Sequence, residues 1–140
     1  MARDEKLDLL RRIPLFAGFG RREIERLGML ADEVAVPDGT VLIQQGDLGR
    51  DMMVLIAGNV VIERDGEQVN RLGPGDFFGE IALVNEGPRT ASVTTDGPAR
   101  LLVVSHTDFH SMMEEFPGIA AQIMHTLANR IRSNEPNAAH

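Results

Sequence analysis

The sequence contains no cysteine, which excludes disulfides and cysteine-based zinc or redox sites. It has no apolar run of about 18 residues, and its first residues lack the apolar stretch of a signal peptide. These absences predict a soluble cytoplasmic protein without a membrane partner. They leave open whether the chain is a complete small protein or part of a longer polypeptide.

Basic residues are few and are almost all arginine. The chain has 14 Lys and Arg against 21 Asp and Glu, a net charge of −7, and Lys6 is its single lysine. Five arginines lie between Arg11 and Arg26, but acidic residues interrupt them. An acidic domain without a basic stripe is a poor nucleic-acid binder, so no direct DNA binding is predicted. The same negative field opposes anionic ligands, and affinity for one must come from a local site.

The length of 140 residues and the hydrophobic content of 43% suit one globular domain with its own core. The residue pattern changes along the chain and divides it into four parts. Short β-rich runs alternate with turn signals about every ten residues in the second part, which favours an antiparallel sandwich or barrel. The parts are an N-terminal helical segment, a β-roll, C-terminal hinge and lid helices, and a flexible tail, at 1–31, 32–105, 106–133 and 134–140.

Helix signals set the ends of the first and third parts. Pro14 ends a first helix of about 3–12, and a second helix is predicted over about 20–31. Ser105-x-x-Asp108 is a capping box that predicts a helix over about 106–115. Pro117 breaks this helix, and a final helix is expected to reach about Ser133 with an apolar stripe that suits packing on the sheet. The stripe consists of Ile119, Ile123, Leu127 and Ile131.

The most informative segment is FGEIALVNEGPRTASV, residues 78–93. It places Gly79 and Glu80 where a short helix is predicted to begin. A helix N-terminus presents unpaired N–H groups and the positive end of the helix dipole, so it can bind an anion. Gly79 lets a ligand oxygen approach the backbone, and the Arg89 guanidinium can hold a phosphate through two hydrogen bonds.

Glu80 is a carboxylate beside this predicted anion site. A carboxylate only accepts hydrogen bonds, so its expected partner is a ligand hydroxyl. Anion site, arginine and hydroxyl acceptor together indicate a sugar phosphate. The alternative is an exposed Glu80–Arg89 ion pair of little energetic value.

The same segment resembles the phosphate-binding cassette of the cyclic-nucleotide-binding domain family, which includes the catabolite activator protein and the regulatory subunits of cyclic-AMP-dependent kinase. Residues 40–63 resemble a second recurrent stretch of that family, with a departure at Met52 and Met53, where the family more often has an aromatic residue. For these methionines, filling of the core is the favoured role. The matching cassette residues are Phe78, Gly79, Glu80, Ile81, Ala82, Pro88, Arg89, Thr90 and Ala91.

The resemblance implies a mainly β fold: an antiparallel, jelly-roll-like double-stranded β-helix with N-terminal helices and two C-terminal helices. It implies that Glu80 binds the ribose 2′-hydroxyl and Arg89 the cyclic phosphate, with backbone N–H groups around Ile81 and Ala82 completing the cradle. A hydroxyl at the position of Thr90 can bind the 2-amino group of guanine in the family. The expected ligand is therefore cyclic AMP or cyclic GMP, without a metal.

Ile62, Val69 and Leu72 are the candidates for an apolar wall over the base, with plain core residues as the alternative. Arg130 and Asn134 fall where the last helix of the family can cover the adenine, although solvent-exposed positions are favoured for both.

The function expected from these features is a non-enzymatic cyclic-nucleotide sensor. Its C-terminal helices would move about a hinge near Phe109–Pro117. It would act as a homodimer or on a partner protein in trans.

An enzyme of the metal-dependent cupin type needs clustered ligands, but all four histidines lie in the C-terminal helical part, at His106, His110, His125 and His140. A β-roll scaffold that has lost its ligand is the other alternative, against which the intact Glu80 and Arg89 argue.

Overall fold

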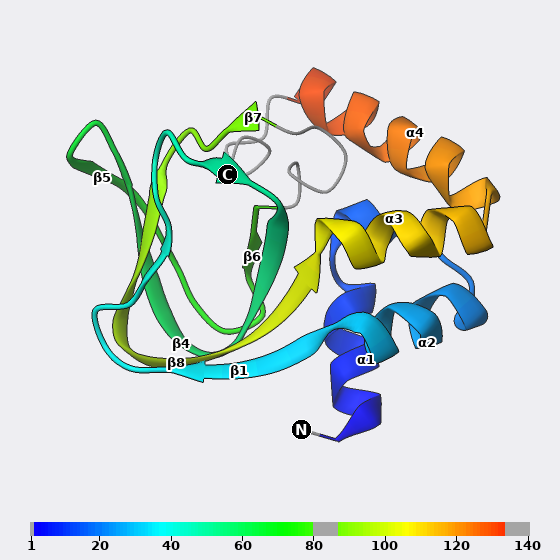
Figure 1. Ribbon diagram of the computed structural model, residues 1–140, viewed down its shortest axis with the longest axis horizontal. Coiled ribbons are helices and arrows are strands. Elements are labelled where there is room, and N and C mark those ends of the chain that lie inside the picture. The colour runs from blue at the N-terminus through cyan, green and yellow to red at the C-terminus, as the bar shows by residue number, and fades with distance from the viewer. Residues whose placement is uncertain (1, 80–86, 134–140) are drawn as a thin grey trace.

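The computed structural model describes residues 2–79 and 87–133. Helices precede and follow a run of strands, and the strands curl into a roll with the helices beside one end of it (Figure 1). The elements are α1 (Arg3–Arg11), the 3₁₀ turn η1 (Pro14–Phe16), α2 (Arg21–Leu30), β1 (Asp32–Val36), β2 (Val41–Ile43), β3 (Leu48–Gly49), β4 (Asp51–Arg64), β5 (Glu67–Leu72), β6 (Phe77–Phe78), β7 (Gly87–Pro88), β8 (Ser92–Ser105), α3 (His106–Glu115) and α4 (Gly118–Ser133).

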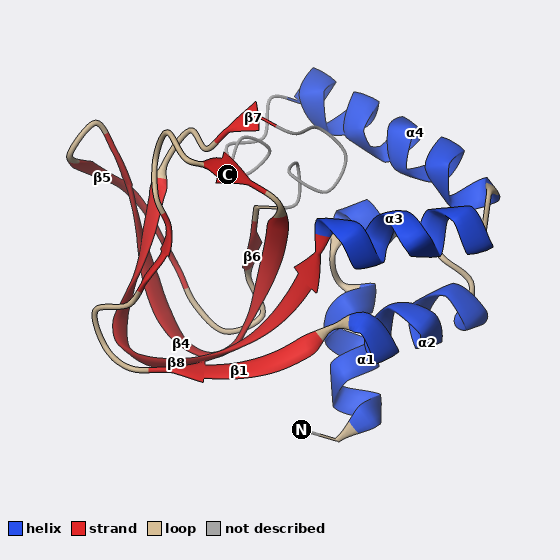
Figure 2. Cartoon of the chain, in the orientation of Figure 1, coloured by secondary structure: helices blue, strands red, loops and turns tan. Residues whose placement is uncertain are grey.

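The main sheet is antiparallel and is organised around two strands of 14 residues, β4 and β8. These strands pair from Asp51↔Ser105 to Glu63↔Ser92, with register shifts between Leu55 and Asn59. Irregularities of this kind bend a strand and increase its twist, which helps the sheet to curl. β1 and β2 pair with β8, β5 and β6 pair with β4, and β3 and β7 form a separate ribbon (Figure 2). The predicted antiparallel β-roll with flanking helices is confirmed.

The turn signals at Gly39, Gly46, Gly66 and Gly75 are confirmed, and each of these glycines has positive φ, a region open to glycine at little cost because it has no Cβ. The turns expected at Gly58-Asn59 and Asp96-Gly97-Pro98 are wrong, because Gly58 lies within β4 and Gly97 within β8. Both glycines have positive φ, and at Gly58 the β4–β8 register shifts.

Two separate apolar clusters stabilise the molecule. The first lies between the helices and one end of the sheet, and it includes Phe16, Met52 and Phe109. The core role predicted for Met52 is confirmed, since its side chain is fully buried. The second cluster fills the interior of the β-roll and includes Leu55, Phe78 and Leu101. The candidate site lies beside this second cluster.

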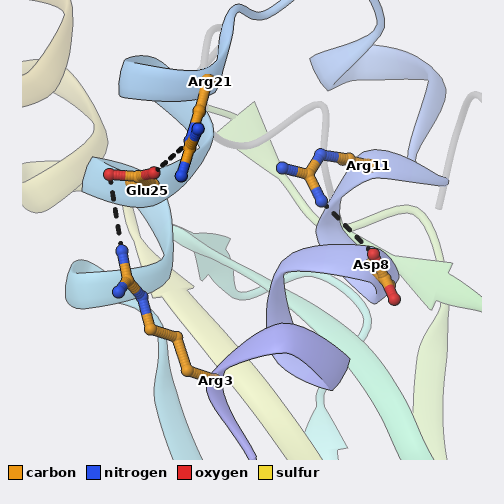
Figure 3. Close-up of polar contacts among 5 residues, drawn as sticks. All are labelled: Arg3, Asp8, Arg11, Arg21 and Glu25. Atoms are coloured by element: carbon orange, nitrogen blue, oxygen red, sulfur yellow. Dashed lines mark hydrogen bonds and ion pairs between the residues drawn. The ribbon is translucent and has the colours of Figure 1, made fainter.

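The N-terminal helices form a layer that depends on buried leucine and isoleucine side chains of α1 and α2. Exposed ion pairs lie on the surface of this layer. Glu25 contacts Arg21 at 2.9 Å and Arg3 at 3.4 Å, and Arg11 contacts Asp8 at 3.3 Å (Figure 3). Exposed pairs contribute little stability, so apolar burial holds the layer together.

The C-terminal helices follow the predicted boundaries closely. The Asp108 N–H donates to Ser105 Oγ at 3.1 Å, which confirms the predicted cap of α3. The expectation that α4 packs on the sheet needs correction, because α4 chiefly contacts η1 and α3. Ile119 and Ile123 are buried in the first cluster, while the side chains of Leu127 and Ile131 lie outside the described part. Across the described residues, no helix combines the length and apolarity that a membrane crossing requires.

Candidate functional site

Arg89 lies between two strands of the roll, directly after β7. Its backbone N–H donates to Asp47 O at 2.8 Å, and its carbonyl accepts from the Gly46 N–H at 2.9 Å. β7 itself pairs with β3 through Leu48↔Pro88 and Gly49↔Gly87. The turn around residues 46–49 therefore fixes the backbone from which the Arg89 side chain extends.

The Arg89 side chain lies across Gly49. A Cβ added to Gly49 would be 1.7 Å from Arg89 Nε, so any larger residue there would displace the guanidinium. Arg89 Nη2 donates to Asp51 O at 2.6 Å, and Nη1 makes a long contact of 3.5 Å with Gly79 O. The half-buried guanidinium is thus oriented by backbone carbonyls of two strand ends.

Gly79 is buried and has φ of +80°. A Cβ at this position would lie 2.8 Å from Arg89 Nη1 and 2.9 Å from Asp51 O. Glycine is therefore needed here twice, for the backbone conformation and for the close approach of Arg89.

Arg89, Gly49 and Asp51 line an open cavity of about 240 Å³. Two arginines and two aspartates are among its lining residues. Ile43 of its lining belongs to the second apolar cluster, and Leu42 and Met53 pack against that cluster. The lining of the cavity therefore combines charged side chains with apolar ones. Its lining is Leu42, Ile43, Gln44, Asp47, Leu48, Gly49, Arg50, Asp51, Met53 and Arg89.

The structure brings together most, but not all, of the apolar residues predicted to line the site. Phe78, Ala91, Ile62 and Leu72 are all buried in the second cluster. Val69 is 48% exposed and lies outside it. The β4–β5 register skips Val69, because Ile62 pairs with Asn70 and Glu63 pairs with Gln68.

The other predicted site residues divide into two groups. Thr90 is exposed, and its carbonyl accepts from Arg64 Nε at 3.2 Å. The remaining positions lie outside the described residues, as does the short helix expected to begin at Glu80. They are Glu80, Ile81, Ala82 and Asn134, together with the Arg130 side chain.

Sequence reasoning did not identify Gly49 or the backbone carbonyl of Asp51 as parts of the site. A signal for Gly49 was present, because glycine inside a strand often marks the close approach of another group. No sequence signal marks a carbonyl acceptor, which depends on where two distant strands meet.

The described residues contain no group of three or more His, Cys, Asp or Glu side chains that could hold a metal ion. His106 and His110 lie one turn apart on α3 with ring centroids 4.1 Å apart.

A hydrogen bond from Arg100 lowers the pKa of the Glu33 carboxyl, but Glu33 is on β1 and does not line the cavity.

Comparisons with known proteins agree with this geometry. A model of the cyclic nucleotide-binding domain matches residues 33–116. The chain is 31% identical over 137 residues to the CRP-like cAMP-activated global transcriptional regulator of Mycobacterium tuberculosis, covering 94% of this chain and 61% of that protein. It is 31% identical over 124 residues to the cyclic AMP receptor protein of Thermus thermophilus, covering 85% and 57%. The chain thus spans about three fifths of these curated relatives.

Solved structures show the same likeness. The N-terminal domain of a transcriptional regulator from Streptomyces coelicolor has a TM-score of 0.82 at 32% identity, covering 91% of this chain and 92% of that one. The regulatory domain of Toxoplasma gondii PKA, crystallised with cAMP, has a TM-score of 0.73 at 28% identity, covering 79% and 44%. With a family model matched over more than half of its length, this chain belongs to the cyclic nucleotide-binding domain family.

Proposed function

We propose that this chain is a non-catalytic sensor of cyclic nucleotides that binds cyclic AMP and also accepts cyclic GMP. The observation that carries the proposal is the placement of Arg89. Its guanidinium lies at the cavity, across Gly49, oriented by the carbonyls of Asp51 and Gly79. A side chain held in this way loses little conformational freedom when it meets a phosphate. A guanidinium also matches phosphate geometry through paired N–H groups.

The lining of the cavity suits both parts of a nucleotide. The cyclic phosphate would lie against Arg89, and the base would lie against Ile43 and the apolar residues near it. Small-ligand sites combine apolar walls with a few polar groups, and both kinds of residue line this cavity. In this proposal Glu80 accepts from the ribose 2′-hydroxyl, and backbone N–H groups of Ile81 and Ala82 complete the phosphate contacts. The relative crystallised with cAMP supports cyclic AMP as the ligand.

Calorimetric titration with cyclic AMP and with cyclic GMP tests the proposal directly. We expect saturable binding of at least cyclic AMP at one site per chain. Absence of heat for both nucleotides, together with no signal in an independent fluorescence binding assay, would contradict it. That result would favour a β-roll scaffold that serves protein contacts.

Thr90→Ala should lower affinity for cyclic GMP more than affinity for cyclic AMP. Thr90 is exposed beside Arg89, where its hydroxyl can reach a guanine amino group. Losing one neutral hydrogen bond costs about 0.5–1.5 kcal/mol, or roughly two- to twelvefold in affinity. Calorimetry on both nucleotides measures the difference. Thr107→Ala, an exposed threonine on α3, is the matched control and should leave both affinities unchanged. Equal losses for the two nucleotides in Thr90→Ala would remove Thr90 from base selection.

The proposed output is movement of the hinge and lid helices over 106–133 against the β-roll over 32–105. Only Phe116 and Pro117 separate α3 from α4, and α4 is attached through Ile119, Ile123 and a hydrogen bond from Gln122 Nε2 to Ala17 O of 3.1 Å. In this proposal α4 shifts as a unit about the short connection between the two helices. This movement would pass the signal to a second copy of the chain or to a partner protein.

We expect amide hydrogen exchange over residues 110–132 to slow when cyclic AMP is added. A ligand shifts such an equilibrium only through different affinities for the two states. Linear 5′-AMP is the matched control, because it has the same base without the cyclic phosphate, and it should leave exchange unchanged. If protection increases only around residues 78–90, the chain binds nucleotide without reporting it through these helices.

A further inference from the structure

Arg89 and Thr90 lie in the short segment between β7 and β8, where the chain changes its hydrogen-bonding neighbours. The ladder between β8 and β4 ends where Ser92 pairs with Glu63. Beyond that pair, the backbone of Arg89 bonds instead to the turn at 46–47. Thr90 therefore lies at the crossover between two structural neighbours, where regular sheet pairing does not fix it.

Side chains connect the turn around Gln45 to the end of β4 near this crossover. Gln45 Nε2 donates to Asp65 Oδ1 at 2.8 Å, and Gln45 Oε1 accepts from the Asp65 N–H at 2.9 Å. The Gln45 N–H donates to Ser92 Oγ at 2.9 Å. Arg64, next to Asp65, donates to the Thr90 carbonyl at 3.2 Å. These four bonds form a closed ring around the crossover, which we call the Gln45 clamp.

The part of the clamp opposite Gln45 is the tip of the β4–β5 hairpin. Arg64 pairs with Glu67, which leaves Asp65 and Gly66 as a two-residue turn with φ of 54° and 83°. Positive φ at both residues is the type I′ geometry that hairpins favour. The Gln45 amide satisfies both the N–H and the carboxylate of Asp65, so it fixes the direction of the tip.

We propose that Gln45 is a positioning residue for the nucleotide contacts, acting through Asp65 and Arg64 on the peptide of Thr90. This inference rests on the proposed function, in which Arg89 and Thr90 touch the ligand. Gln45 does not line the cavity, whereas its neighbour Gln44 does. Its effect on affinity is therefore indirect, through the segment between β7 and β8 that carries Arg89 and Thr90.

In the clamp the Gln45 amide donates a hydrogen bond and the Asp65 carboxylate accepts it, and this direction can be reversed by substitution. Gln45→Glu replaces the donor that meets Asp65 Oδ1 with a second carboxylate oxygen, so two negative groups face each other. Adding Asp65→Asn to this variant restores the pair with roles reversed, because the amide now at position 65 donates to the carboxylate now at position 45. Asp65→Asn alone is the matched control. Its amide oxygen can still accept from Gln45, and asparagine tolerates positive φ.

Calorimetry should show that Gln45→Glu lowers nucleotide affinity by roughly 3- to 10-fold, the size of one or two lost hydrogen bonds. The ratio of cyclic AMP to cyclic GMP affinity should shift as well, because Thr90 is displaced. Asp65→Asn should bind like the parent, and the double variant should recover both values. A double variant as defective as Gln45→Glu would overturn the proposal, as would an unchanged affinity and ratio in Gln45→Glu.

A measurement without nucleotide separates the clamp from the proposed function. Amide exchange at residues 89–92 in the free protein should accelerate in Gln45→Glu and return to the parent rate in the double variant. Should the parent bind neither nucleotide, the proposed function fails while this measurement still decides the clamp. Unchanged exchange at 89–92 in Gln45→Glu would show that Gln45 does not hold this segment in place.

Discussion

Arg89→Ala should nearly abolish binding of cyclic nucleotide while leaving the β-roll folded. The substitution removes a charge-assisted pair of hydrogen bonds to the phosphate, on the order of 2–4 kcal/mol, which is roughly a 30- to 800-fold loss of affinity. The Asp51 carbonyl loses a donor, but Asp51 lines an open cavity that water can enter, and the contact of Arg89 with the Gly79 carbonyl is already long at 3.5 Å. Folding should therefore change much less than binding. Calorimetry measures the affinity, and urea unfolding measures the stability.

Arg50→Ala is the matched control for this variant. Arg50 lines the same cavity and is exposed, whereas the backbone of Arg89 is fixed by the turn at 46–47. Its loss should weaken binding only through the general field at the mouth, by about threefold or less at physiological salt. Arg89→Lys should give an intermediate affinity, since lysine keeps the charge without the planar fork. Equal losses in Arg50→Ala and Arg89→Ala would mean that net charge, and not the placement of Arg89, determines affinity.

Local signals in the sequence predicted the elements well. Pro14, Pro117 and the Ser105 cap carry their information within a few residues, and the helices begin and end close to those points. The turn glycines act in the same local way, because a positive φ is a property of one residue.

Contacts between distant segments were harder to predict. Val69 was expected beside Leu72 in one apolar wall, but the irregularity in the β4–β5 pairing falls at Val69, and only Leu72 is buried. The direction of the α4 stripe was also missed, since amphipathicity predicts a buried face without naming what covers it. In the site, Arg89 was predicted, whereas its supports at Gly49 and Asp51 come from strands about 40 residues earlier in the sequence.

The support beneath Arg89 leads to the second large effect. Gly79→Ala should destabilise the fold and also displace the arginine. A residue with a Cβ at φ of +80° costs about 1–2 kcal/mol for the backbone conformation alone. The new Cβ would lie 2.9 Å from Asp51 O and 2.8 Å from Arg89 Nη1. The carbonyl belongs to the backbone of β4 and cannot give way easily, so the arginine must move. We expect a total loss of about 2–4 kcal/mol of unfolding free energy.

Gly75→Ala separates the two causes. Gly75 has φ of +90°, but a Cβ there would meet nothing within 4 Å. Its N–H donates to Leu55 O at 2.8 Å, and alanine keeps that bond. This control should therefore lose only the conformational part, about 1–2 kcal/mol, and should bind nucleotide like the parent. Urea unfolding of the three proteins gives the stabilities, and calorimetry well below the unfolding temperature gives the affinities. If both substitutions cost the same stability and neither affects binding, the close contact at Gly79 does not support Arg89. A larger stability loss together with an affinity defect in Gly79→Ala alone would show that the absence of a side chain at Gly79 is needed both for the backbone packing against β4 and for the position of Arg89.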